Sequence, residues 1–299
     1  MVKIKFKNNK AIELEKYSKD PDSILYDRKL VNIMDRMKIR QDKKFDNVII
    51  LFGDVGTGKT TLAFTMLQYM LNGNMNISNV GVGTSDSLKK ISRVPDKSGV
   101  IFDDASTIFY SSDHNAKKQK LAIKILHLCR SKGLTIFITT PDLFKINPYV
   151  VTQRSRMVIK CYTKQDYSRG FFCAWDYAHI KPLYYLEKKN QGMIPGSVRP
   201  QLIGIFGNYI PPFELEYEKL KRRAMKELID DKVKLNKQEK KTIYIEMLER
   251  LIKFKEEGMK VNYTDFARIV GLSDATISKY KNEIGNETEE LSQIEAPVC

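Results

Sequence analysis

Three apolar runs with many branched side chains recur in the first half of the chain, and each ends in polar or small residues. They are VIILF from residue 48, GVIFD from residue 99 and LTIFITT from residue 134. Continuous runs of this length are typical of strands buried on both faces, as in a parallel sheet. Between the first two runs, TLAFTMLQYML places apolar residues at helical spacing. The pattern predicts an α/β fold with a mainly parallel sheet.

Shorter patterns lie on either side of these runs. The segments GFFCAWDYAHI, KPLYYLEK and LIGIFG (residues 202–207) are rich in aromatic and branched side chains, which favours further short strands. Near the N-terminus, MVKIKF predicts an edge strand and SILYDRKLVNIMDRMKI a helix. We therefore expect an N-terminal extension over residues 1–45 and an α/β domain over residues 46–210.

The composition changes after the paired prolines at 211 and 212. Residues 211–241 are highly charged and helix-favouring, which predicts a solvated helical connector. Residues 286–299 are polar and are expected to be disordered. Between them we expect a small all-α domain over residues 242–285. Its first helix has apolar positions on one side: Ile243, Met247, Leu248, Leu251 and Phe254.

The segment YTDFARIVGLSDATISKYKN, residues 263–282, has the spacing of a helix-turn-helix. Ala267 is small, Gly271 follows four residues on, and Ile277 lies six beyond that. Two helices that meet at a steep angle need a small residue where their backbones approach and a glycine at the turn. This fold binds DNA or another protein. If it binds DNA, the residues expected to face the major groove are Ser273, Asp274, Thr276, Ser278, Lys279 and Asn282.

The stretch GDVGTGKTT, residues 53–61, follows the VIILF run without a gap and fits the pattern GxxxxGK[ST]. Glycines let backbone N–H groups turn inward around phosphate oxygens, and the next helix directs its partly positive N-terminus at the same anion. The pattern therefore predicts an ATP site. Its residues are Gly53, Asp54, Val55, Gly56, Thr57, Gly58, Lys59, Thr60 and Thr61.

Residue chemistry assigns roles around this loop. Lys59 would bridge the β- and γ-phosphates, and the Thr60 hydroxyl would ligate Mg²⁺. The GVIFD run ends in a pair of carboxylates. Asp103 would hold Mg²⁺ through water, and Asp104 would orient or deprotonate the attacking water.

The third run ends in Thr139 and Thr140. Ligands bind at the carboxyl ends of strands in open parallel sheets, so one of these threonines is expected to sense the γ-phosphate. We assign the catalytic role to Thr140. Just before this run, LAIKILHLCRSKGL at residues 121–134 predicts an amphipathic helix that ends near Arg130 and is followed by a glycine.

This order of phosphate loop, acidic strand end, helix ending in an arginine and apolar strand closing on a polar residue resembles the FtsK/HerA superfamily of DNA pumps. That superfamily takes in conjugative coupling ATPases and phage assembly ATPases related to zonula occludens toxin. The resemblance covers residues 48–160. It implies a RecA-like ATPase that forms a ring, often a hexamer, and couples ATP hydrolysis to the movement of DNA. Many members have glutamine where this chain has Thr139 and Thr140.

The resemblance also implies an arginine finger. Members commonly present an arginine to the γ-phosphate of the neighbouring subunit, and Arg130 stands at the matching position. A finger supplied in trans stabilises transition-state charge and makes hydrolysis depend on assembly. Arg154 and Arg156 compete for this role, because AAA+ loader ATPases place a finger arginine after the sensor strand. An AAA+ protein would also have a helical lid after residue 160, where short strands are expected instead.

Composition bears on the partner and the compartment. Lysine and arginine number 51 against 36 acidic residues, a net charge of +15, which favours a polyanionic partner. Together with the helix-turn-helix spacing, this points to DNA, expected to be double-stranded. The four cysteines lack CxxC spacing, which fits a reducing cytoplasm. No run approaches the roughly 18–20 apolar residues of a membrane helix, so membrane insertion is not expected.

These patterns predict a cytoplasmic ATPase that uses ATP and Mg²⁺, assembles as an oligomer on DNA, and translocates, packages or segregates it. An alternative is a nucleotide-switched DNA-binding ATPase without processive movement, such as a helicase loader or a regulator of partition, transposition or replication. A third possibility is a degenerate motor with a transcriptional tail. The intact Lys59, Thr60 and Asp103 argue against it.

Overall fold

The computed structural model describes most of the 299-residue chain: residues 1–8, 10–15, 23–104, 109, 116–191, 194, 197–258, 260, 262–282 and 284. The chain divides into two compact units, Met1–Ala224 and Met225–Cys299. The terminal segment predicted to be disordered, residues 286–299, lies outside the described residues.

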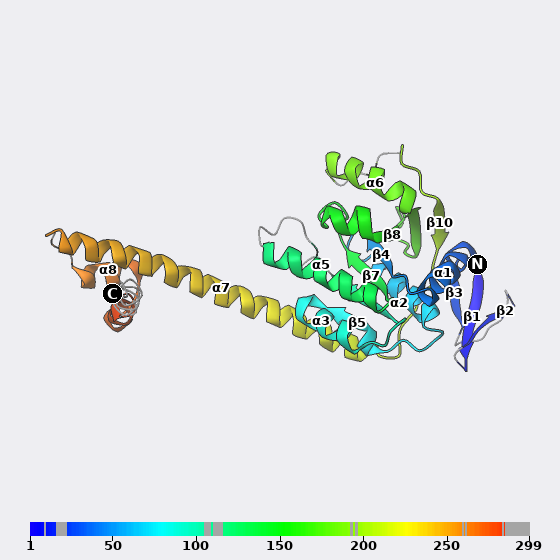
Figure 1. Ribbon diagram of the computed structural model, residues 1–299, viewed down its shortest axis with the longest axis horizontal. Helices are drawn as coiled ribbons and strands as arrows, with labels where there is room; N and C mark the ends of the chain where they lie inside the picture. Colours follow the sequence, from blue (N-terminus) through cyan, green and yellow to red (C-terminus); the bar gives the residue numbers. More distant parts are fainter. Residues whose placement is uncertain are drawn as a thin grey trace, which may run out of the picture. The chain divides into compact units, whose positions relative to one another are not determined.

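A mixed sheet forms the centre of the first unit (Figure 1). Within the described residues it has seven strands in the order β10-β9-β8-β4-β7-β6-β5. The five strands from β8 to β5 are parallel, and β9 and β10 are antiparallel additions. This confirms the predicted α/β fold with a mainly parallel sheet. The strands are β4 Asn47–Phe52, β5 Val80–Val82, β6 Gly99–Asp103, β7 Thr135–Thr140, β8 Ser155–Tyr162, β9 Phe171–Asp176 and β10 Leu202–Ile205.

Helices cover both faces of the sheet. Alternate side chains of each central strand point to opposite sides, and because both sets are apolar, both faces must be buried. In β4, Ile49 and Leu51 lie in one apolar cluster, and Val48 and Ile50 lie in the other. The first cluster includes side chains of α1 and α2, and the second includes side chains of α3, α5 and α6. The helices are α1 Arg28–Asp42, α2 Lys59–Met70, α3 Gly83–Arg93, α5 Ala116–Ser131 and α6 Tyr177–Lys189, with a 3₁₀ turn at Ile77–Asn79 and a π-helical turn at Val150–Arg154.

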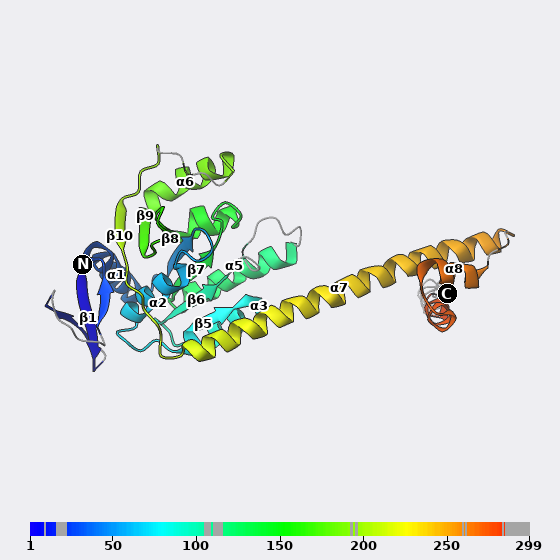
Figure 2. The same cartoon turned by 180° about the vertical axis from the view of Figure 1, so that it is seen from behind.

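The N-terminal extension forms a small antiparallel sheet beside α1 (Figures 1 and 2). Its strands are β1 Val2–Lys7, β2 Lys10–Leu14 and β3 Ile24–Tyr26. The predicted strand at MVKIKF is confirmed, but its predicted edge position is wrong, since β1 pairs with both β2 and β3. Val2 and Ile4, two residues apart in β1, both belong to the first apolar cluster. One face of β1 therefore packs on the core, while both of its edges are hydrogen-bonded to neighbouring strands.

The first helix starts later than predicted. Residues 24–26 belong to β3, and α1 begins at Arg28 because the Asp27 carboxylate accepts hydrogen bonds from the backbone N–H groups of Lys29 and Leu30. Such a cap satisfies N–H groups that have no partner within the helix.

The region after residue 160 corrects another prediction. FFCAWD forms β9 and LIGI forms β10, as expected, but the YAHI end of the first segment and all of KPLYYLEK lie within α6. The buried residues Ile180, Leu183, Tyr184 and Glu187 follow helical spacing, and this periodicity outweighs the strand preference of the aromatic side chains. The Tyr184 hydroxyl donates to the carbonyls of Phe144 and Ile146, which fixes α6 against the loop after β7.

The predicted connector and the helix after it are one helix, α7 Glu214–Glu256. The sequence between these ends contains no glycine or proline, so nothing interrupts the helix. Of the predicted packing positions, Leu248 is buried, whereas Ile243, Met247 and Phe254 are exposed.

The second unit has a small core of its own, formed by Leu248, Phe266, Ala267 and Ile277. Helix α8 Tyr263–Val270 ends at Gly271, whose φ of +68° is in the left-handed region, and residues 274–282 are helical. The Thr276 N–H donates to the Ser273 hydroxyl, so Ser273 caps this second helix. The assignment of this pair as a DNA-binding helix-turn-helix stays a prediction.

Candidate nucleotide site

The loop after β4 requires glycine at its first position. Gly53 has a φ of +133°, and a Cβ there would lie 2.1 Å from the carbonyl oxygen of Cys161 in β8. Gly58, at +89°, is the N-cap of α2. Thr57 is buried, and its hydroxyl donates to the carbonyl of Asp54, which closes the turn. Strand, loop and helix therefore form the phosphate-binding arrangement expected from the sequence.

Lys59 lies at the start of α2, and its side chain folds back along the loop. The ammonium donates to the carbonyl oxygens of Gly53 (2.7 Å) and Asp54 (2.8 Å). Partial burial lowers the pKa of Lys59, while the charges of Cys161, Asp103 and other acidic groups oppose this shift. A bound phosphate would replace the two carbonyls as the partner of this cation.

Asp103 ends β6 and is almost fully buried, with 3% exposure. One carboxylate oxygen accepts hydrogen bonds from the hydroxyls of Thr60 (2.7 Å) and Thr139 (2.8 Å). Because β7 lies between β4 and β6, its Thr139 reaches the carboxylate of the neighbouring strand. The Thr139 hydroxyl also accepts from the backbone N–H of Asp104 (2.9 Å).

The structure distinguishes the two threonines at the end of β7. Thr139 bonds directly to Asp103, whereas the Thr140 hydroxyl donates to the carbonyl of Asp142. Both still line one cavity of about 250 Å³, together with Asp104. The geometry favours Thr139 over the predicted Thr140 as the residue coupled to Asp103, the carboxylate predicted to hold the metal. The sensor role of either one stays a prediction.

The same cavity contains donors suited to Mg²⁺. The Thr60 hydroxyl and the Asp103 carboxylate are hydrogen-bonded, and both are hard oxygen ligands of the kind that Mg²⁺ prefers. Mg²⁺ is usually held by one or two carboxylates plus substrate phosphates and waters, so this pair fits the ion. Asp104 lies next to them, exposed and with a positive φ of +48°.

Two residues of α7 complete the site, and neither was predicted from the sequence. The Tyr217 hydroxyl donates to the second carboxylate oxygen of Asp103, and the Lys221 ammonium lies 3.8 Å from that oxygen. The signal was an apolar stripe within the charged segment, at Phe213, Tyr217, Leu220 and Ala224, all of which pack on the first cluster.

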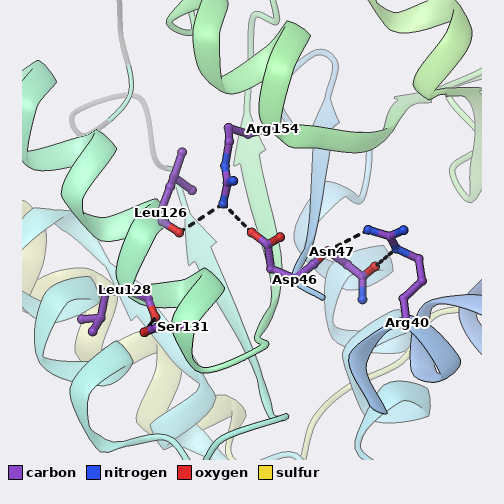
Figure 3. Close-up of polar contacts among 7 residues, drawn as sticks. All are labelled: Arg40, Asp46, Asn47, Leu126, Leu128, Ser131 and Arg154. Carbon is purple, nitrogen blue, oxygen red and sulfur yellow. Dashed lines mark hydrogen bonds and ion pairs between the residues drawn. The ribbon is translucent and has the colours of Figure 1, made fainter. Parts of the chain in front are cut away.

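The three finger candidates differ in their surroundings. Arg154 forms an ion pair with Asp46 and donates to the carbonyl of Leu126, at 3.2 Å (Figure 3). The Arg154 and Asp46 side chains are only 12% and 13% exposed. The Arg156 guanidinium lies 4.9 Å from the centre of the Tyr177 ring. Arg130, at the end of α5, is exposed.

The predicted DNA-contacting residues lie in the second unit. Ser273, Asp274, Ser278, Lys279 and Asn282 are exposed, and Thr276 is half-buried. Among the helices of the described segments, none has the length and apolar content needed to cross a membrane.

This fold and site define a P-loop NTPase, an enzyme that hydrolyses nucleoside triphosphates. The phosphate loop leads into α2, and its threonine bonds to the carboxylate at the end of a strand two places away. Residues 36–157, which contain the loop, Asp103 and Thr139, match the family model of Novel STAND NTPase 3. The NTP-hydrolysing P-loop enzyme predicted from the sequence is thereby confirmed.

Solved structures give further similarities. The N-terminal domain of zonular occludens toxin from Neisseria meningitidis matches with 14% identity and a TM-score of 0.35, over 57% of this chain and 98% of that one. B204, the DNA-packaging ATPase of Sulfolobus turreted icosahedral virus, matches with 15% identity and a TM-score of 0.33, over 56% and 100%. At these identities neither similarity assigns an activity to this chain. The comparison with curated proteins gave no match.

Proposed function

We propose that the chain is an ATP-hydrolysing motor that assembles as a ring on double-stranded DNA and translocates, packages or segregates it. One of the similar structures is that of a DNA-packaging ATPase, which is compatible with this activity. The net charge of +15 suits a polyanionic partner. The proposed compartment is the cytoplasm.

In the proposed reaction, loop N–H groups and Lys59 bind the β- and γ-phosphates. Thr60 and Asp103 would hold Mg²⁺, which neutralises charge on the phosphates when bound. Asp104 would orient the attacking water or accept its proton, while Thr139 holds the Asp103 carboxylate and the Asp104 backbone in a fixed relation.

The observation that carries the proposal is the separation of Arg130 from the loop of its own subunit. The loop follows the carboxyl end of β4, whereas Arg130 precedes the amino end of the parallel β7. A six-residue strand separates these edges by roughly 17 Å, beyond the reach of an arginine side chain. Arg130 can therefore contact a γ-phosphate only on another subunit, so hydrolysis would require assembly.

The test uses two variants that are each expected to be inactive. Lys59→Ala removes the phosphate-binding cation, and Arg130→Ala removes the finger. In an equal mixture, roughly a quarter of the interfaces would combine an intact Lys59 with an intact Arg130, so ATP hydrolysis should partly return. Lys124→Ala, at another exposed cation of α5, is the matched control and should keep full activity.

Hydrolysis is measured with and without double-stranded DNA, alongside the size of the complex. Strong stimulation by DNA in a closed oligomer, with displacement of a bound roadblock protein, supports the motor. Full turnover by Arg130→Ala, or no recovery on mixing, overturns the finger in trans.

One contact favours the alternative, a nucleotide-controlled DNA-binding switch. Tyr217, which bonds to Asp103, belongs to the same helix as residues of the second unit. In that case ATP should change the affinity for DNA, turnover should be slow, and no roadblock should be displaced.

A further inference from the structure

The first turns of α7 are anchored beside the nucleotide site. Phe213, the residue before α7, and Tyr217, in its first turn, are buried, and both rings meet Phe64 of α2 edge to face, with centroids 6.0 and 5.2 Å apart. Both views show this end of α7 beside β5 and the start of α3 (Figures 1 and 2). The anchor places the next turn of α7 next to Asp103.

Lys221 lies one turn after Tyr217 and lines the cavity that contains Lys59, Thr60 and Asp103. Its ammonium is 3.8 Å from Asp103 and 5.2 Å from the centre of the Tyr217 ring. The side chain is 45% exposed, whereas the Asp103 side chain is 4% exposed. A partly exposed cation therefore lines the same cavity as the loop lysine.

The loop has a second cavity, of about 230 Å³, which is lined by Gly58, Thr61, Arg169, Phe206 and Asn208. The metal donors Thr60 and Asp103 line the first cavity. Mg²⁺ held by Thr60 and Asp103 would lie beside the terminal phosphates, so the first cavity fits the terminal phosphate, and the second would be left for the α-phosphate and nucleoside.

We propose that Lys221 binds the terminal phosphate of the nucleotide in cis, and that Tyr217 is a positioning residue that holds Asp103 toward the metal. The inference rests on the proposed binding of ATP at this loop. An ammonium on a flexible stem can leave Asp103 for a phosphate that carries more charge. The cation would therefore distinguish ATP from ADP.

The first experiment is an equilibrium titration with a fluorescent non-hydrolysable ATP analogue and with fluorescent ADP, both with Mg²⁺. Lys221→Ala should weaken binding of the ATP analogue about tenfold, at the lower end for a charge-assisted hydrogen bond because the site is partly exposed. Binding of ADP should stay unchanged. Lys221→Arg should recover most of the loss. Lys219→Ala, at an exposed lysine of the same helix outside the cavity lining, is the matched control.

An unchanged ratio of the two affinities in Lys221→Ala overturns the inference and leaves the proposed function intact. Equal loss for both nucleotides also overturns it, because Lys221 would then not act at the terminal phosphate. A wild-type chain that binds neither nucleotide contradicts the proposed function itself.

Tyr217→Phe tests the positioning role without removing the ring that packs on Phe64. We expect the Mg²⁺ concentration for half-maximal binding of the ATP analogue to rise about threefold to tenfold, the range for one hydrogen bond. Urea unfolding, followed by fluorescence of the single tryptophan, Trp175, checks that the fold is retained. An unchanged Mg²⁺ dependence in the folded variant contradicts the role.

Discussion

The ion pair between Arg154 and Asp46 gives a prediction that separates a structural arginine from a catalytic one. Both side chains are nearly buried, at 12% and 13% exposure, and Arg154 also donates to the carbonyl of Leu126 (Figure 3). In Arg154→Ala the Asp46 carboxylate keeps its burial and loses its cation. We therefore expect this substitution to destabilise the first unit.

The magnitude follows from the burial. Removing one partner of a fully buried ion pair costs roughly 3–5 kcal/mol, and the slight exposure here indicates the lower end, about 3 kcal/mol. With a urea m value near 3 kcal/mol/M, the unfolding midpoint should fall by about 1 M. The melting temperature should fall by roughly 6–12 °C for a unit of this size.

Urea unfolding followed by Trp175 is the assay, because this side chain is buried in the first unit and is the only tryptophan of the chain. The double variant Asp46→Asn with Arg154→Met should lose about 1–2 kcal/mol less than the sum of the single changes, since it leaves no unpaired charge. Arg130→Ala, at an exposed position, should keep the wild-type unfolding free energy within about 0.5 kcal/mol while it loses hydrolysis.

An unchanged midpoint in Arg154→Ala would refute this reasoning. So would a double variant that loses the full sum. Loss of hydrolysis in a fully stable Arg154→Ala would instead support Arg154 as the finger.

Three further predictions concern individual residues. Burial raises the pKa of Glu187 from 4.5 to about 8, opposed by the Lys160 charge and supported to a smaller extent by the Asp142 charge, so the native state keeps a proton that the unfolded state loses. Unfolding free energy should therefore fall by about 1.4 kcal/mol per unit as pH rises from 4.5 to 8, and a pH series of urea midpoints should show that Glu187→Gln removes this slope. Thr139→Val should weaken Mg²⁺-dependent binding of an ATP analogue about tenfold in titration, whereas Thr140→Val should bind normally, because only Thr139 bonds to Asp103. Gly53→Ala should lower the unfolding free energy by roughly 2–4 kcal/mol or prevent folding, whereas Gly56→Ala, whose Cβ would meet nothing closer than 3.7 Å, should cost less in the same urea assay. Equal midpoints for the two glycine variants would contradict the strain argument.

The central part of the fold could be predicted because its signals are local. The apolar run before Gly53, the glycines of the loop and the apolar residues of α2 lie within 24 residues. Local patterns, the apolar periodicity and the glycine spacing, are therefore enough to predict them. The partner of Asp103 on β7 could not be predicted in the same way. Its identity depends on register, since Phe102 pairs with Ile138 and this places Thr139 beside the carboxylate. A shift of one residue in the register between β6 and β7 would instead have placed Thr140 beside the Asp103 carboxylate.

Helices caused the larger errors. In α6 the aromatic content suggested strands, and the helical spacing of Ile180, Leu183 and Tyr184 decided the outcome. In α7 the charged composition hid the stripe that begins at Phe213 and continues to Tyr217. The charged residues correctly predicted that one side of α7 faces solvent. Which residues the other side packs against depends on contacts that are distant in the sequence, and composition does not reveal them.

The environment of Asp103 has a consequence for how the sequence can diverge. Three hydroxyls from positions 43, 36 and 114 residues away meet on this one carboxylate. A homologue that lost one of these hydroxyls would have a buried carboxylate with fewer hydrogen-bond donors. Selection would then favour compensating changes at the positions of the other two hydroxyls. We therefore expect Thr60, Thr139 and Tyr217 to vary as a group among homologues. A tyrosine or other hydroxyl donor at the position of Tyr217 should mark those relatives in which the segment after the sheet contacts the nucleotide site.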